Sequence, residues 1–251
     1  MAEIILVTGA SAGFGQAICR RLVADGHRVI GAARRIEKLQ ALHEELGEAF
    51  YPLQMDVTDL TQVDQALASL PADWEQIDVL VNNAGLALGL APAQKAEIAD
   101  WLTMIQTNII GLTYLTRQIL PQMVERNDGY VINMGSTAGT VPYPGANVYG
   151  ASKAFVKQFS LNLRADLAGK QIRVTNIEPG LCEGTEFSSV RFKGDEKRVE
   201  ALYRDAHAIQ PEDIANTVSW LIQQPKHVNV NRIEIMPVSQ TFGPQPVYRG
   251  D

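Results

Sequence analysis

The sequence has few cysteines, no excess of basic residues and no long apolar run. Its two cysteines, Cys19 and Cys182, lie far apart, which argues against a disulfide framework, a zinc site or a redox motif. Its 22 Lys and Arg against 28 Asp and Glu give a net charge of −6, which disfavours nucleic acid or an anionic membrane as partner. No run nears the ~18 apolar residues that span a bilayer, and the apolar start lacks the basic segment of a signal peptide. We therefore expect a reduced, cytoplasmic setting and a small-molecule partner.

Length and composition favour one domain over residues 1–251. The 251 residues are 46% hydrophobic and 20% charged, which is enough to bury a sizeable core. No repeat, low-complexity tract or linker marks a boundary. Two irregular stretches stand out: residues 180–195, which are a candidate lid over a substrate site, and an extended tail at residues 237–251.

Short β-branched runs alternate with longer segments of helical period along the whole chain. Predicted strands cover residues 3–8, 28–33, 50–55, 79–82, 130–134, 173–177 and 232–236. Predicted helices cover residues 14–24, 35–46, 62–70, 98–124, 148–167 and 211–223. This alternation is typical of βαβ units, so we expect an α/β fold with a doubly wound, seven-stranded parallel sheet and helices on both faces.

A glycine-rich turn joins the first predicted strand to the first predicted helix. Gly9, Gly13 and Gly15 lie in LVTGASAGFGQAI. Glycines let the backbone turn tightly and approach a pyrophosphate, whose charge the helix N-terminus favours. A turn without any ligand is the structural alternative, but the strand before it and the helix after it favour a dinucleotide site.

The second predicted strand ends in Ala33-Arg34-Arg35, where NAD-binding units place a carboxylate for the ribose hydroxyl. An arginine there would instead bind a 2′-phosphate through charged hydrogen bonds. The alternative is that Arg34 and Arg35 are solvated residues of a helix start, where cations are slightly unfavourable. The sequence therefore favours NADP(H).

Further motifs follow the predicted elements in order. They are Asp56-Val57, NNAG at residues 82–85, Asn108, Ser136, YGASK at residues 149–153 and Pro179-Gly180. Together they resemble the short-chain dehydrogenase/reductase family, with its Rossmann-like fold, over nearly the whole chain. GLCEGTEFSSVRFKGD and EIMPVSQ further resemble the NADP-dependent 3-hydroxy acid dehydrogenases, a branch also described as serine dehydrogenases and malonic semialdehyde reductases.

The resemblance implies specific roles for matching residues, and a homotetramer built through the helices predicted at residues 98–124 and 148–167. The implied catalytic group is Asn108, Ser136, Tyr149 and Lys153, with Ser136 and Tyr149 also touching substrate. The implied cofactor site is Gly9, Ala10, Ser11, Ala12, Gly13, Phe14, Gly15, Arg34, Arg35, Asp56, Val57, Asn83, Tyr149, Lys153, Pro179, Gly180 and Thr185.

The chemistry needs these residue types. Hydride transfer to a carbonyl leaves an alkoxide that must be protonated, and a tyrosine can do this if its pKa is lowered from about 10. Lys153 lies four residues from Tyr149 on one helix face, and a cation ~4 Å away contributes about 4 kcal/mol at a dielectric of ~20. Ser136 would polarise the substrate oxygen, and Asn108 would hold a proton-relaying water. Singly, each could be an ordinary structural residue; together they favour catalysis.

The substrate class depends on the candidate lid. Arg191 is the expected carboxylate anchor, although a solvated loop arginine is the alternative. No histidine belongs to a metal-ligand cluster, and we expect no metal. We expect an NADP-dependent oxidoreductase of small 3-hydroxy acids. A carbonyl or 3-oxoacyl-carrier reductase and a non-catalytic NADPH-sensing module remain alternatives.

Overall fold

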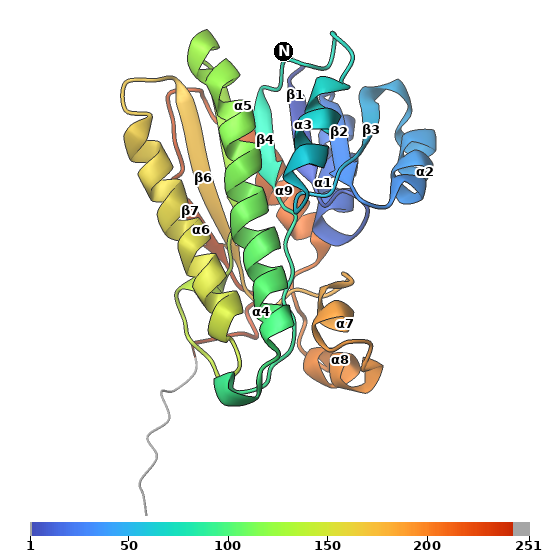
Figure 1. Ribbon diagram of the computed structural model, residues 1–251, viewed down its shortest axis with the longest axis vertical. Coiled ribbons are helices and arrows are strands. Elements are labelled where there is room, and N and C mark those ends of the chain that lie inside the picture. The colour runs from blue at the N-terminus through green and yellow to red at the C-terminus, as the bar shows by residue number, and fades with distance from the viewer. Residues whose placement is uncertain (1, 243–251) are drawn as a thin grey trace, which may run out of the picture.

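The chain folds around one parallel β-sheet, which a computed structural model describes for residues 2–242 (Figure 1). The strands are β1 (Ile4–Thr8), β2 (Arg28–Ala33), β3 (Phe50–Gln54), β4 (Val79–Asn82), β5 (Gly129–Met134), β6 (Ile172–Pro179) and β7 (Arg232–Ile235). They lie in the order β3-β2-β1-β4-β5-β6-β7, and neighbouring strands are parallel. The predicted seven-stranded sheet is confirmed.

Helices cover both faces of the sheet, as predicted. They are α1 (Gly13–Ala24), α2 (Ile36–Leu46), α3 (Leu60–Ala68), α4 (Ile98–Ile105), α5 (Leu112–Arg126), α6 (Asn147–Asp166), α7 (Phe187–Arg191), α8 (Glu196–Tyr203) and α9 (Pro211–Gln223). Short 3-10 turns occur at η1 (Gly47–Ala49), η2 (Ala93–Lys95) and η4 (Thr137–Gly139).

Two predictions about helices need correction. The single helix predicted at residues 98–124 is α4 and α5 joined by a π-helical segment, η3 (Gln106–Gly111), and α5 continues to Arg126. The stretch 180–195, predicted to be irregular, contains α7, and α8 follows directly. These two helices lack the apolar stripe on which the prediction depended, because α8 buries none of its residues and α7 buries only Ser188.

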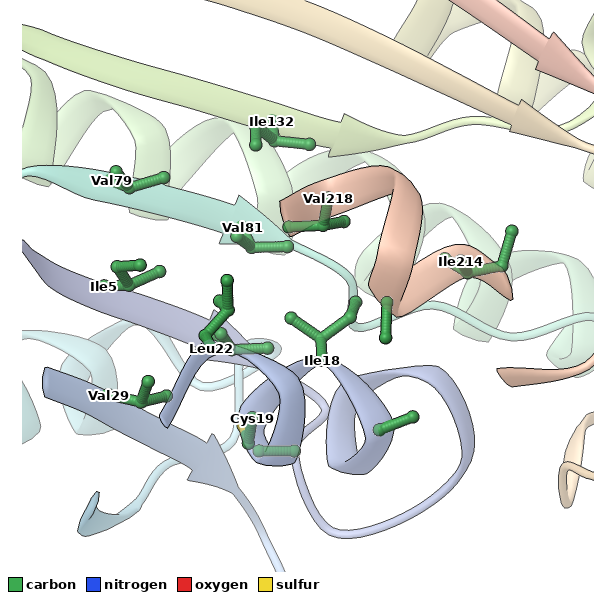
Figure 2. Packing of buried hydrophobic residues seen from close by; sticks show 14 of the residues in the cluster. Ile5, Ile18, Cys19, Leu22, Val29, Val79, Val81, Ile132, Ile214 and Val218 are labelled. Carbon is green, nitrogen blue, oxygen red and sulfur yellow. The ribbon is translucent and has the colours of Figure 1, made fainter. Parts of the chain in front are cut away.

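The core has two layers because successive strand residues point to opposite faces of the sheet. Toward one face, Ile5 and Val81 pack with Ile18 of α1 and Val218 of α9 (Figure 2). Toward the other face, alternate strand residues pack against α3, α5 and α6. This second layer includes Leu6, Ile30, Leu80, Val131, Val63, Leu115, Ile119 and Leu163. Burial on both faces explains why the central strands β1 and β4 are almost continuously apolar.

The strand order reverses between β1 and β4, and such a reversal opens a crevice at the carboxyl edge of the sheet. Thr8 joins the two loops that leave this edge. Its hydroxyl accepts hydrogen bonds from the backbone N–H groups of Asn83 at 3.0 Å and Ala84 at 2.9 Å. The Asn83 amide donates to the Thr8 carbonyl at 2.8 Å. The glycine turn and the NNAG loop are thus fixed to each other.

Residues 181–203, here called the cover segment, form one wall of this crevice and include α7 and α8. The side-chain oxygen of Gln240 accepts a hydrogen bond of 2.7 Å from the Leu181 N–H. The rest of the expected tail, from residue 243 onward, lies outside the described residues. Among the described helices, none is both long and apolar enough to cross a membrane.

Candidate active site

A cleft of about 610 Å³ opens between the strand ends and the cover segment. Most residues selected from the sequence line it: Gly9, Ser11, Ala12, Gly13, Phe14, Arg34, Arg35, Asp56, Val57, Asn83, Ser136, Tyr149, Lys153, Pro179, Gly180, Thr185 and Arg191. Ala10, Gly15 and Asn108 do not line it. Ala10 points into the hydrophobic core instead, and its N–H donates to the Ala32 carbonyl at 3.1 Å.

The turn after β1 has no room for a side chain at its three glycine positions. Gly9 and Gly13 have φ values of +68° and +52°, which favour glycine. A Cβ on Gly15 would lie 2.2 Å from the Gly9 carbonyl oxygen, and one on Gly13 would lie 3.0 Å from Thr185. Because α1 begins at Gly13, the unpaired N–H groups of its first turn also lie at the cleft. This arrangement fits a pyrophosphate.

The two arginines after β2 have different partners. Arg34 is exposed at the cleft, and among residues 2–242 its guanidinium makes no hydrogen bond or ion pair with a side chain. Arg35 donates to the Ser11 hydroxyl at 3.0 Å and to Glu186 of the cover segment at 2.8 Å. The end of β2 therefore presents cations to the cleft, which suits a phosphate better than a ribose hydroxyl.

Tyr149 and Lys153 lie one turn apart on α6, so they share a helix face as predicted. Both are almost fully buried, with exposed fractions of 7% and 6%. The Lys153 ammonium donates a hydrogen bond of 2.8 Å to the Met134 carbonyl at the end of β5. The same nitrogen lies 5.9 Å from the centre of the Tyr149 ring.

Burial has opposite effects on these two groups. It raises the pKa of Tyr149 to about 12 and lowers the pKa of Lys153 to about 8. The charge of Lys153 alone, before loss of solvent is counted, was expected to lower the pKa of Tyr149 by roughly three pKa units. In the structure, loss of solvent outweighs the nearby charges, and the cation that lowers the Tyr149 pKa is Arg191. At pH 7 the phenol is therefore protonated and the lysine mostly charged, which suits donation of a proton to a substrate oxygen.

Ser136 follows β5 and precedes the turn η4. Its hydroxyl accepts the Ala138 N–H at 3.1 Å and donates to the Pro179 carbonyl at 3.4 Å, and the nearby Ser136 hydroxyl lowers the pKa of the Tyr149 phenol. The two hydroxyls therefore lie close together at the cleft. A single carbonyl or alcohol oxygen can contact both, as an acid/base and a polarising donor require.

Asn108 lies in the π-helical segment η3 and is buried behind the cleft wall. Its amide nitrogen donates to the Leu86 carbonyl at 2.9 Å and to the Ser152 hydroxyl at 3.0 Å, while its oxygen accepts the Leu86 N–H at 2.9 Å. A Cβ on Gly85 would lie 3.3 Å from this oxygen and 3.4 Å from the Lys153 nitrogen. Asn108 and Lys153 thus face one small space, and the water expected between them stays a prediction.

Arg191, at the end of α7, lies over Tyr149. Its guanidinium carbon is 5.4 Å from the ring centres of both Tyr149 and Tyr143, and it donates to the Tyr143 hydroxyl at 2.8 Å. Tyr143 was not among the predicted site residues, because no motif or spacing in the sequence marks this loop residue. Phe187, also missed, packs against Tyr149 with ring centres 5.8 Å apart.

The end of the cleft that Asp56 and Val57 line has a simpler structure. The carboxylate of Asp56 accepts hydrogen bonds from the N–H and the hydroxyl of Thr58, at 2.9 and 2.8 Å, and so fixes the turn that carries Val57. Within the part of the chain that the structure describes, no group of three His, Cys, Asp or Glu side chains could hold a metal ion.

Comparison with known proteins agrees with this geometry. The family described as short chain dehydrogenase matches residues 3–196. The NADP-dependent 3-hydroxy acid dehydrogenase YdfG of Salmonella typhi is 59% identical over 246 residues, which are 98% of this chain and 99% of that protein. The serine 3-dehydrogenase of Agrobacterium fabrum is 51% identical over 249 residues, or 99% of each chain.

A solved structure described as the closed form of serine dehydrogenase complexed with NADP+ has the same fold. It superposes with a TM-score of 0.97 at 57% identity, and the match covers 98% of this chain and 100% of that one. Matches of this identity and coverage show membership of one protein family and not only a common fold. The chain belongs to the short-chain dehydrogenase family.

Proposed function

We propose that this protein is an NADP-dependent dehydrogenase that interconverts small 3-hydroxy acids, such as L-serine or 3-hydroxypropionate, with their 3-oxo acids. The names of its relatives support the reaction class. The exposed Arg34 at the end of β2 supports NADP over NAD, since a guanidinium gains most from a phosphate partner.

The observation that carries the substrate class is the position of Arg191. Its guanidinium lies beside Tyr149 at the cleft and is oriented by the Tyr143 hydroxyl. A short 3-hydroxy acid places its carboxylate two carbons from the reacting carbon, so a cation next to the proton-transfer group can hold it. A planar guanidinium matches the two oxygens of a carboxylate.

When NADP is bound, its nicotinamide supplies or accepts the hydride. Tyr149 gives its proton to the substrate oxygen during reduction, and its phenolate form removes a proton from the substrate hydroxyl during oxidation. Ser136 donates a hydrogen bond to the same oxygen, which stabilises the charge that develops there. Lys153 keeps a positive charge behind the phenol, and Arg191 orients the substrate.

We also propose a cytoplasmic homotetramer. Both cysteines are free, Cys19 in the core and Cys182 at the cleft, as reducing surroundings allow. Large apolar side chains are exposed on α4 and α6, including Ile98, Leu102 and Phe155. Such side chains on neighbouring helices are typical of a surface covered by another subunit.

The reaction can be tested by following NADPH absorbance with a panel of substrates. The panel contains L-serine, 3-hydroxypropionate, malonic semialdehyde, an acetoacetyl carrier and bulky neutral ketones. We expect turnover with the small 3-hydroxy and 3-oxo acids. A preference for the carrier or the ketones would replace the proposal with the carbonyl or carrier reductase, and NADPH binding without any turnover would favour a sensing module.

Arg191→Met tests the carboxylate anchor. Losing one partner of a charged hydrogen-bonded pair should lower kcat/KM for 3-hydroxy acids roughly 30-fold or more and spare matching neutral alcohols. The control is Arg198→Met, since Arg198 lies over Phe192 and outside the cleft lining. Unchanged kinetics on the acids in Arg191→Met would refute the anchor.

A further inference from the structure

One carboxylate ties the cover segment to α2. Glu186, just before α7, accepts hydrogen bonds from the Arg35 guanidinium at 2.8 and 3.1 Å and from the Lys38 ammonium at 2.9 Å. These cations lower the pKa of Glu186 to about 2, so the carboxylate is ionised at neutral pH. The three side chains are 40–48% exposed, which places the cluster at the rim of the cleft.

Arg35 uses most of its donors in this arrangement. Its Nε and Nη2 donate to the Ser11 hydroxyl at 3.3 and 3.0 Å, while Nη1 and Nη2 donate to the two Glu186 oxygens. A guanidinium has five N–H groups in one plane, so these bonds leave no pair for a bidentate contact with another anion. Arg34 is the neighbouring cation that keeps its donors for a ligand.

We propose that Glu186 is a positioning residue whose carboxylate holds the cover segment to Arg35 and Lys38; this contact is called the clasp below. It follows that Arg34 rather than Arg35 binds the 2′-phosphate of NADP. The inference rests on the proposed function in taking NADP as the cofactor. The net charge of the side chains around this site matches that of a phosphate. Arg34, Arg35 and Lys38 together with the Glu186 carboxylate leave two positive charges, and a phosphate monoester carries about −1.5 to −2 at neutral pH.

The other side of the cover segment is held by the loop after β4 and by α4. The Arg191 carbonyl accepts the Gly89 N–H at 2.9 Å, and Lys193 pairs with Asp100 of α4 at 2.8 Å. The segment therefore bridges the two walls of the cleft, with Glu186 holding its cofactor side. Because the clasp touches α2 rather than the 2′ group, it slows the escape of NADP and NAD alike.

Glu186→Gln removes the charge of the clasp and keeps the side-chain shape. We expect faster hydrogen exchange in residues 181–203 of the protein without cofactor. Release of NADPH and of NADH, measured by stopped-flow fluorescence, should both speed up by about 2- to 5-fold, the range expected of exposed ion pairs. High salt should reduce this difference between variant and wild type. The matched control is Glu45→Gln, which breaks the Arg20–Glu45 pair, at 2.7 Å, on the far ends of α1 and α2.

The two arginines provide the second test. Arg34→Ala should weaken NADP binding about 10- to 100-fold, as loss of charged hydrogen bonds predicts, and leave NAD unchanged. Arg35→Ala should weaken both cofactors by the same small factor. Adding Glu186→Gln to it should cause only the smaller further loss of the remaining Lys38 contact. The proposal is overturned if Arg35→Ala weakens NADP alone, if Glu186→Gln tightens NADP, or if exchange and release in Glu186→Gln match wild type.

These outcomes are separable from failure of the proposed function. If calorimetry detected no binding of NADPH or NADH to the wild-type protein, the proposed function would fail. Hydrogen exchange of residues 181–203 in Glu186→Gln and Glu45→Gln would still decide whether Glu186 holds the segment.

Discussion

Proton transfer at the cleft depends on one phenol. Tyr149→Phe keeps the ring and its packing on Phe187 but removes the hydroxyl, so turnover should fall by at least the ~10²-fold that acid/base catalysis supplies. NADPH affinity, measured by fluorescence titration, should stay near that of wild type. Tyr114→Phe is the control, because its hydroxyl bonds Asp64 outside the cleft lining. Near-normal turnover in Tyr149→Phe would exclude the assigned role.

Lys153 shows that a residue placed for chemistry can reduce stability. Its pKa is about 8 in the folded chain and 10.5 for an ordinary lysine. Between these pH values the unfolded chain binds one more proton than the folded chain, so the free energy of unfolding rises with pH across this window. Below about pH 8 the folded chain carries the full cost of a buried charge.

Lys153→Met should therefore raise the free energy of unfolding at pH 7, by about 1–3 kcal/mol after the lost hydrogen bond to Met134 is counted. Turnover should be lost. Urea unfolding at pH 7 and pH 10 measures the effect, and the gain should shrink at pH 10, where wild type has itself lost the proton. Lys157→Met, one turn along α6, is the control. A variant less stable than wild type at pH 7, or a gain independent of pH, would contradict this account.

Individual residues differed in how far the sequence could identify them. Ser136, Tyr149 and Lys153 were selected through their resemblance to the motifs of short-chain dehydrogenases, and the chemistry of carbonyl reduction gives each of these residue types a possible role. Tyr143 and Glu186 could not be selected, since their roles depend on contacts with Arg191 and Arg35 at far separations in sequence. Such contacts leave no local pattern.

At the scale of elements, the sequence predicted the strands and the long helices to within about two residues of their bounds, and it missed one π-helical break and the short helices α7 and α8. Each of the seven strands lies within about two residues of its predicted bounds. The clearest signals are the apolar runs of β1 and β4, which are covered on both faces of the sheet. The π-helical break η3 was missed, since the apolar period continues across it. It is explained by the buried Asn108 amide, whose bonds to Leu86 and Ser152 hold that turn.

Helix α9 begins at Pro211, as predicted, and its first turn offers a test. The Asp213 carboxylate accepts the N–H of Gln210, the residue before the helix, at 2.9 Å. Asp213→Ala should lower the free energy of unfolding by about 0.5–2 kcal/mol, as for other lost caps. Glu212→Ala removes the same charge from the same turn and controls for the helix dipole. If urea unfolding gave the same loss of free energy of unfolding for Asp213→Ala and Glu212→Ala, the charge alone, and not the cap, would stabilise this end of the helix.

At the scale of the whole molecule, one layer of helices leaves apolar side chains uncovered. Helices α5 and α6 cover the same face of the sheet, and α4 is joined to α5 through η3 (Figure 1). On α4, Ile98 and Leu102 are 64% and 59% exposed, and on α6, Phe155 is 38% exposed and stacks on Phe159. A second subunit that covered these helices, as in the proposed tetramer, would bury these apolar side chains.

Phe155→Glu tests this assembly because it places a charge on that surface without reaching the core. We expect sedimentation to give a tetramer for wild type and smaller species for the variant, since burying an unpaired carboxylate at an interface is costly. Gln40→Glu adds the same charge to an exposed position of α2 and should leave the tetramer intact. The melting temperature of wild type should rise with protein concentration, because association stabilises the folded chain by mass action, and a variant that no longer associates should lose this dependence. A wild-type monomer, or a tetramer in Phe155→Glu as stable as in wild type, would remove these helices from the interface.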